Sequence, residues 1–180
     1  QASGWPGRVP ASVQRPPRLI GRDAEWAALN EAWEARRCVV VSGEGGLGKT
    51  RLVSDFALAR GGVVMASARP GDQGVAYASF SRWLRALPGD LWPGLPPAVR
   101  REMARLLPEL GDEPQAPQGN TAPRRDAVDR TRLFNAAALV IERAAQTLQG
   151  AVFDDLHFAD DASVELLQFA LPATRWCWLL

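Results

Sequence analysis

Apolar residues recur along this chain in two rhythms, one typical of strands and one typical of helices. Short runs of consecutive apolar residues predict buried strands at residues 38–42, 63–66, 151–153 and 176–180. Between these runs the apolar positions return every three or four residues, which predicts amphipathic helices. The predicted helices span residues 22–37, 50–60, 79–87, 97–107, 128–148 and 164–171. Strands that alternate with helices predict an α/β fold, a parallel sheet with helices on both faces.

The remaining segments predict how the domain is bounded. Residues 1–17 are rich in proline and small residues without any period, so we expect an extended linker. We expect one domain over residues 18–180, and the strand predicted at 176–180 reads as unfinished, so we expect this domain to be truncated at its C-terminus. Asp23 is a plausible cap for the first helix, and residues 110–126 read as a loose loop.

Composition narrows the class of protein. The 180 residues carry a net charge of +1, which favours neither a nucleic-acid surface nor an acidic partner. No apolar run approaches the roughly 18 residues of a membrane span, and no leader peptide opens the chain, so we expect a cytoplasmic protein without membrane contact. Cys38 and Cys177 lie in apolar runs, so we expect two buried free thiols. The seven tryptophans are expected in the core.

Lysine usage points to one short segment. Of the 21 basic residues 20 are arginine, and the single lysine is Lys49. An arginine-rich chain with abundant alanine, glycine and proline suggests a gene rich in G and C, and hence a bacterial source. In such a background lysine is expected where arginine cannot replace it. Lys49 lies in a glycine-rich turn between a predicted strand and a predicted helix.

This turn, GEGGLGKT at residues 43–50, fits the pattern G-x-x-x-x-G-K-[ST] at every fixed position. Glycines let backbone N–H groups converge on an anion, and the helix that follows directs its N-terminal dipole to the same place. We expect Lys49 to reach the β- and γ-phosphates of a nucleotide and the Thr50 hydroxyl to bind Mg²⁺. A plain glycine-rich turn is the alternative. The predicted nucleotide-binding residues here are Gly43, Glu44, Gly45, Gly46, Leu47, Gly48, Lys49, Thr50 and Arg51.

A magnesium nucleotide also needs a carboxylate on a neighbouring strand. The predicted strand at 151–153 leads into Asp154 and Asp155. We expect Asp154 to hold Mg²⁺ through water, and Asp155 to orient or deprotonate the attacking water. By itself the pair would favour a strand end followed by a helix cap, and the glycine turn upstream is what shifts the interpretation to a nucleotide site. His157, the only histidine, either contacts the γ-phosphate side of the site or makes a structural hydrogen bond.

Three stretches carry a family resemblance: RLIGRDAEWAALNEAW at 18–33, the glycine turn, and FDDLHFADDASVELL at 153–167. Together they resemble the AAA-type P-loop ATPase module of bacterial multidomain regulators, the STAND group with its large LuxR-type and SARP/BTAD-type transcription factors. The resemblance implies ATP or ADP with Mg²⁺ as cofactors, and it places Ile20, Gly21 and Arg22 near the adenine. The group's His-Trp-Ala-Asp sequence is present as residues 157–160, with Phe158 in place of tryptophan.

The predicted function is an ATP-binding, slowly hydrolysing switch in a bacterial signal-transducing transcriptional regulator. ATP is the expected ligand, DNA would be contacted only through a domain outside this segment, and self-association or contacts with neighbouring domains are possible partners. Three alternatives use the same loop differently. They are a phosphotransferase that moves the γ-phosphate to a metabolite, an initiator-type AAA+ ATPase that acts on DNA, and an interaction scaffold with a degenerate site. Intact Lys49, Thr50 and Asp154 argue against the scaffold.

Overall fold

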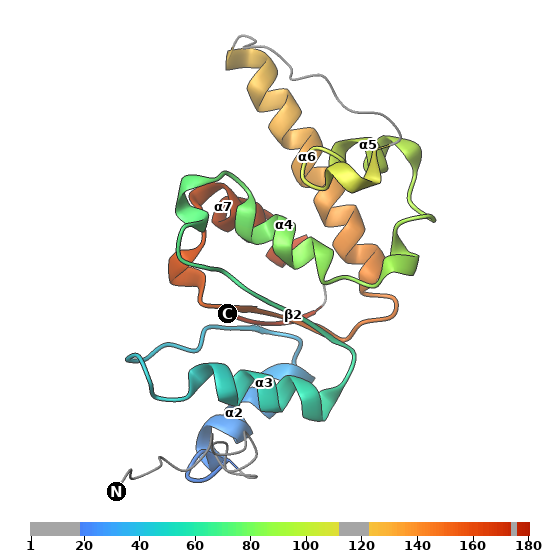
Figure 1. The fold of residues 1–180 in the computed structure, drawn as a ribbon. Helices are drawn as coiled ribbons and strands as arrows, with labels where there is room; N and C mark the ends of the chain where they lie inside the picture. The colour runs from blue at the N-terminus through green and yellow to red at the C-terminus, as the bar shows by residue number, and fades with distance from the viewer. Residues whose placement is uncertain (1–18, 112–122, 174–175) are drawn as a thin grey trace, which may run out of the picture.

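A four-stranded sheet forms the centre of the molecule (Figure 1). The computed structural model describes residues 19–111, 123–173 and 176–180. All neighbouring strands are parallel, in the order β1-β4-β3-β2, which confirms the predicted parallel α/β fold. The strands are β1 (Cys38–Val39), β2 (Val63–Ser67), β3 (Gly150–Asp154) and β4 (Cys177–Leu179).

Helices cover both faces of the sheet, as predicted. Figure 1 shows α2 and α3 below the sheet and α4 to α7 above it. The α-helices are α2 (Asp23–Glu34), α3 (Lys49–Arg60), α4 (Ala78–Arg85), α5 (Pro97–Met103), α6 (Pro123–Ala144) and α7 (Asp161–Ala170). Short 3₁₀ turns are η1 (Asp72–Gly74), η2 (Gly89–Leu91), η3 (Pro108–Leu110), η4 (Leu156–Phe158) and η5 (Leu171–Ala173).

The two faces of the sheet bury separate hydrophobic clusters. The smaller one lies under α2 and α3, where Phe56 is fully buried between Trp26 and Trp33 in edge-to-face contacts. The larger one lies under α4 to α7 and holds Trp83 against Trp176 and Trp178. The described tryptophans are therefore core residues, four of them buried and two half-buried, as expected.

β4 joins the two halves of the sheet, because it lies between β1 and β3. β1 has only two strand residues, yet the pairing continues past it: Val41 N–H donates to the Leu180 carbonyl at 2.8 Å, and Leu180 N–H donates to Val39 at 2.9 Å. The carboxyl ends of β1 and β3 lead into the two predicted nucleotide motifs. Because the strands are parallel, these ends lie on the same side of the sheet, with β4 between them.

Several local predictions were wrong. Asp23 is the first residue of α2 rather than its cap, since Arg22 occupies the cap position and no side chain caps this helix. α6 begins at Pro123, inside the predicted loop, because proline suits the first turn of a helix. Cys38 is exposed on the edge strand, and only Cys177 is a buried thiol. The predicted linker, residues 1–17, and most of the predicted loop lie outside the described residues.

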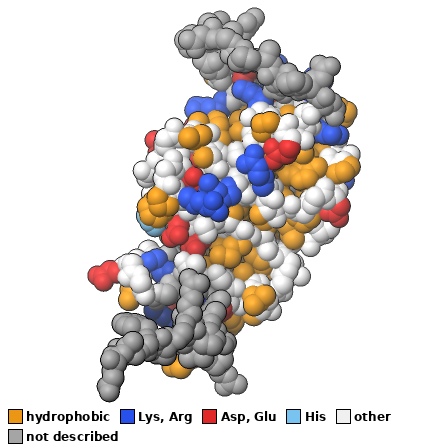
Figure 2. Space-filling model, in the orientation of Figure 1, with side chains coloured by type: hydrophobic (Ala, Val, Ile, Leu, Met, Phe, Trp, Pro, Cys, Tyr) orange, Lys and Arg blue, Asp and Glu red, His pale blue; other side chains and the backbone are white. Residues whose placement is uncertain are grey.

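Charged side chains of both signs are interspersed on the face of the molecule seen in Figure 2. Ion pairs at the surface of the molecule include Arg85 with Glu109 at 2.8 Å and Arg130 with Glu165 at 2.9 Å. Within the described residues, no helix combines the length and the apolar character that a membrane crossing requires.

Candidate functional site

The glycine loop runs from the end of β1 to the start of α3. Gly46 and Gly48 have φ angles of 82° and 78°, in the left-handed region that only glycine adopts without strain. Gly48 is the cap residue of α3 and has no side chain that could accept a hydrogen bond from the first turn of this helix. N–H groups at a helix N-terminus are the groups that bind anions in sites of this kind.

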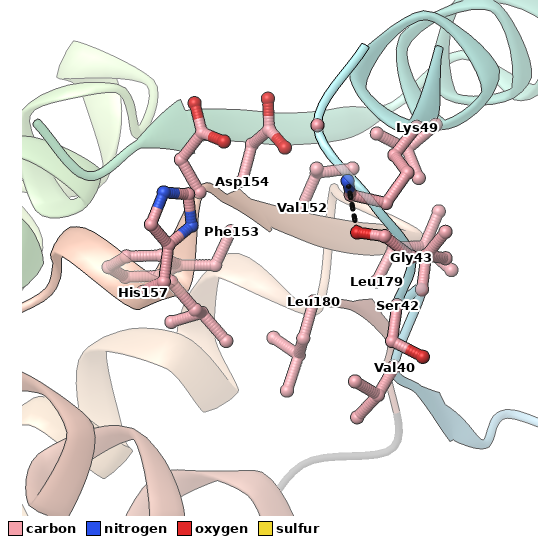
Figure 3. A pocket seen from close by; sticks show the side chains of 15 residues that line it. Val40, Ser42, Gly43, Lys49, Val152, Phe153, Asp154, His157, Leu179 and Leu180 are labelled. Atoms are coloured by element: carbon pink, nitrogen blue, oxygen red, sulfur yellow. Dashed lines mark hydrogen bonds between the residues drawn. The ribbon is translucent and has the colours of Figure 1, made fainter. Parts of the chain in front are cut away.

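Lys49, the first residue of α3, folds back over this loop. Its ammonium group donates to the carbonyl oxygens of Gly43 and Glu44, each at 2.8 Å, and Figure 3 shows the bond to Gly43. An ammonium has three N–H donors, so these two bonds hold the side chain in the loop and leave one donor for a ligand. Thr50 is exposed beside it. Arg51 instead pairs with Asp55 one turn along α3, at 3.2 Å.

Asp154 ends β3 as a buried carboxylate, only 9% exposed. Its Oδ2 atom is buried and has no hydrogen-bond partner within the described residues. An unpaired buried carboxylate oxygen is costly, so its presence at a strand end indicates a site for a cation or an ordered water. Asp155, the next residue, is half-buried and has a φ of 56°, which turns the chain sharply into η4.

These two motifs face each other across a pocket of about 440 Å³. In Figure 3, Lys49 and Gly43 lie on one side, Asp154 and His157 lie on the other, and apolar side chains of β3 and β4 lie between them. The lining residues are Val40, Val41, Ser42, Gly43, Gly45, Lys49, Val53, Val152, Phe153, Asp154, Asp155, Leu156, His157, Leu179 and Leu180. The structure thus brings Gly43, Gly45, Lys49, Asp154 and Asp155 together at one pocket.

Other predicted site residues do not line this pocket. The Arg22 guanidinium donates to the Leu47 carbonyl at 2.6 Å and pairs with Glu25, so the segment predicted near the adenine contacts the glycine loop directly. Ile20 is 85% exposed beside it. The predicted residues outside the lining are Ile20, Gly21, Arg22, Glu44, Gly46, Leu47, Gly48, Thr50 and Arg51. Their roles toward a nucleotide stay predictions.

The residues present fit a magnesium ion that arrives with a nucleotide. No group of three or more His, Cys, Asp or Glu side chains in the described part of the chain could hold a metal alone. Mg²⁺ is usually bound through one or two carboxylates, waters and substrate phosphates. Asp154 with its unpaired oxygen supplies one such carboxylate, and the Thr50 hydroxyl lies at the start of the helix opposite.

The structure places the His157 side chain in the pocket lining and a hydrogen bond on the His157 main chain. Its ring lines the pocket and contacts Phe158, with 3.9 Å between the ring centroids. Its backbone carbonyl accepts a hydrogen bond from the Gln73 side chain at 3.0 Å. Among the described residues the imidazole itself has no hydrogen-bond partner, so the structural hydrogen bond involves the main chain and leaves the ring to the pocket.

Asp160 is a structurally important residue whose role the sequence reading missed. It is 2% exposed and caps α7 by accepting a hydrogen bond from Ser163 N–H. It also accepts from the backbone N–H groups of Tyr77 and Ser79, at the start of α4. Burial raises the pKa of Asp160, but these hydrogen bonds outweigh that effect and leave the pKa lowered. The Asp-x-x-Ser spacing of residues 160–163 is the signal that could have revealed the cap.

A third buried carboxylate, Asp72, follows β2. Arg82 pairs with both of its oxygens, and the Ser79 hydroxyl and Arg69 N–H also donate to it. The Arg82 guanidinium holds the pKa of Asp72 well below its usual range. Nothing in the sequence pattern pairs these two residues, ten positions apart, since a loop and the start of α4 separate them.

Comparison with known proteins gives one match. The sequence model for the AAA ATPase domain matches residues 18–175, nearly the whole chain. Searches of curated proteins and of solved structures found no match. The matched span contains the glycine loop, strands β1 to β3 and Asp154, and on that basis the chain belongs to the family of AAA ATPase domains.

Proposed function

We propose that this chain is the ATP-binding, slowly hydrolysing switch module of a bacterial signal-transducing transcriptional regulator. The observation that carries the nucleotide part is the pocket itself. A lysine ammonium and the N-terminus of α3 lie on one side, and a buried carboxylate oxygen without a partner among the described residues lies on the other. A triphosphate with its magnesium ion has this distribution of charge.

The chain's own groups would divide the work. The glycine-loop amides and the Lys49 ammonium would hold the phosphates and neutralise charge on the γ-phosphate. Thr50 and Asp154 would hold the magnesium ion, which when bound shields the charge that develops between the β- and γ-phosphates. Asp155 would orient the attacking water and accept its proton. The apolar floor of Val152 and Leu179 would keep other water away.

Slow turnover follows from what the pocket lacks. No arginine lines it among the described residues. An arginine finger in such sites contributes about 10³ to 10⁵ in turnover, so a site without one should bind nucleotide long before it hydrolyses it. This behaviour suits a switch better than a motor or a metabolic phosphotransferase.

The regulatory part rests on resemblance and on charge. The three motifs resemble those of the STAND regulators, and the net charge of +1 argues against DNA binding by this domain. DNA binding would therefore belong to another domain of a longer cytoplasmic protein. In that protein, Lys49→Ala should abolish the transcriptional response at its target promoters.

Binding of labelled ATP tests the nucleotide site directly. Binding should be lost in Lys49→Ala and should persist in Asp155→Asn, whose turnover should fall. Arg60→Ala, at the other end of α3, removes the same charge away from the pocket and should bind ATP like the unmodified chain. Equal binding by Lys49→Ala and the unmodified chain would refute the proposal. Phosphate release that required an added acceptor would instead favour a phosphotransferase, and release stimulated by DNA would favour an initiator-type ATPase.

A further inference from the structure

One buried carboxylate links the wall of the pocket to the start of α4. Asp160 accepts hydrogen bonds from Ser163 N–H at 2.8 Å and from the Ser163 hydroxyl at 2.7 Å. It also accepts from Tyr77 N–H at 2.7 Å and Ser79 N–H at 3.2 Å, while the Ser163 oxygen accepts from Phe80 N–H at 2.9 Å. One side chain therefore caps two helices, α7 and α4, that are remote in sequence.

The segment that Asp160 ends is the one that lines the pocket. It starts at Asp155, whose φ of 56° is unfavourable for a residue with a side chain. It continues through His157, whose carbonyl is held by Gln73. The loop between β2 and α4 thus holds this segment at two points, through Gln73 and through the amides on Asp160. A strained turn keeps its conformation only when its surroundings fix both ends.

The α4 side of this link is itself rigid. The Ser79 hydroxyl donates to Asp72 at 2.7 Å and the Ser79 N–H donates to Asp160, so Ser79 connects these two buried carboxylates. Arg82 pairs with Asp72 and also donates to the Ser67 carbonyl at the end of β2, at 3.3 Å. A continuous polar network therefore runs from the pocket wall to the neighbouring strand. Fully satisfied buried networks of this kind fix a single arrangement of the segments they join.

We propose that Asp160 is a positioning residue for the nucleotide site: by tying residues 155–158 to α4, it holds Asp155 and His157 in the pocket. The inference rests on the proposed function for its consequence in turnover, but its structural core can be tested without nucleotide. The competing view is that Asp160 only stabilises the two helices and that the pocket wall keeps its position without it.

The sequence supplies two single-residue probes for this test. Lys49 and His157 are the only lysine and the only histidine of the chain, and they lie on opposite walls of the pocket (Figure 3). Isotope labelling of these two amino acids in a chain freed of any affinity tag gives one NMR side-chain signal from each wall. Asp161→Asn is the matched control, since Asp161 is the exposed neighbour of Asp160 in the first turn of the same helix.

Without nucleotide, Asp160→Ala should move or split the His157 signal by more than its linewidth and leave the Lys49 signal in place. Asp161→Asn should change neither signal. If both signals of Asp160→Ala appear at the positions of an unfolded chain, this variant does not fold and Asp160→Asn is used in its place. The asparagine amide keeps one acceptor oxygen. This variant should shift His157 in part. A His157 signal that coincides with that of the unmodified chain in the folded variant, or an equal shift in Asp161→Asn, would overturn the inference.

Nucleotide titrations then separate this inference from the proposed function. In Asp160→Ala the Lys49 signal should still respond to Mg·ATP with an affinity within about threefold of the unmodified chain, while turnover falls by at least about tenfold. Leu133→Ala, a core change in α6, destabilises the fold without touching the network, and it should leave both quantities unchanged. Failure of the unmodified chain to respond to Mg·ATP would refute the proposed function alone. If Asp160→Ala and Leu133→Ala lost affinity to the same extent and turnover to the same extent, the role of Asp160 would be overturned.

Discussion

Asp154 and Asp160 are both buried carboxylates, 9% and 2% exposed, yet their removal should change stability in opposite directions. Asp154 has a buried oxygen without a partner among the described residues. Asp160 accepts hydrogen bonds from three residues and caps two helices. A side chain kept for a ligand costs free energy while the ligand is absent, whereas a side chain kept for the fold does not.

The magnitudes follow from these contacts. An unsatisfied buried polar group costs about 1–3 kcal/mol, and truncation of Asp154 to alanine also removes about one methylene of packing, worth about 0.8 kcal/mol. Asp154→Ala should therefore raise the free energy of unfolding by about 1 kcal/mol. Loss of a helix cap costs about 0.5–2 kcal/mol, and Asp160 caps two helices, so Asp160→Ala should lower the free energy of unfolding by about 1–4 kcal/mol.

Thermal and urea unfolding in EDTA, without nucleotide, measure both changes. For a domain of this size 1 kcal/mol corresponds to about 2–4 °C in Tm, which is readily resolved. The same melts with Mg·ATP should raise the Tm of the unmodified chain, because a ligand that binds only the folded state stabilises it. Asp154→Ala should lose the part of that increase that depends on magnesium.

Two results would refute this reasoning. A lower Tm for Asp154→Ala in EDTA would mean that its carboxylate serves the fold rather than a ligand. If Mg·ATP raised the Tm of Asp154→Ala as much as it raises the Tm of the unmodified chain, Asp154 would not hold the ion. Either result would remove the main structural support for the magnesium site.

Other contacts give three further predictions. Arg82 lowers the pKa of Asp72 in the folded chain, so this pair stabilises the fold fully above the ordinary aspartate pKa of about 4 and progressively less below it. The unmodified chain should therefore lose stability between about pH 5 and pH 2. In Asp72→Asn this loss, measured by urea unfolding, should be smaller. Cys38 is exposed, while burial raises the pKa of Cys177 to about 11, so a thiol reagent at neutral pH should modify one cysteine in the native chain and two in urea. Arg22→Ala should weaken nucleotide binding by about three- to tenfold, since one hydrogen bond to the glycine loop contributes about 0.5–1.5 kcal/mol.

Each of these predictions has a control. Glu109→Gln breaks an exposed ion pair instead of a buried one, and the acid dependence of its stability should stay close to that of the unmodified chain. Cys38→Ser should leave no thiol reactive in the native chain. Arg37→Ala removes an exposed guanidinium paired with Glu31 and should bind nucleotide normally. Weakened binding in Arg37→Ala would attribute the Arg22 effect to charge alone.

The sequence predicted the parts of this molecule that follow local rules. The glycine loop with its lysine is one continuous segment and the aspartates after β3 are another, and strand–helix alternation brings the segments that follow parallel strands to the same end of the sheet. The pairing of Asp160 with the amides of Tyr77 and Ser79 could not be predicted, because it joins segments about 80 residues apart. The donors on the partner segment are backbone N–H groups, which every residue except proline has, so the sequence does not mark them.

The local errors have the same origin. The apolar run around Cys38 predicts a strand, but the run does not tell whether that strand lies inside the sheet or at its edge. Only the order β1-β4-β3-β2 places Cys38 at an edge. Asp23 has the right residue type for a cap, yet the helix begins at this residue itself.

The short pairing between β1 and β4 has a consequence for how the protein is made. Residues 38 and 39 pair with residues 178 and 179, so the strand before the glycine loop gains its hydrogen-bonded neighbour only after residue 179 has been synthesised. During translation the glycine loop therefore stays without this strand pairing while residues 51–179 are synthesised. A nascent chain that stalls earlier would expose the apolar face of α3, which is buried in the smaller hydrophobic cluster of the folded chain, to chaperones.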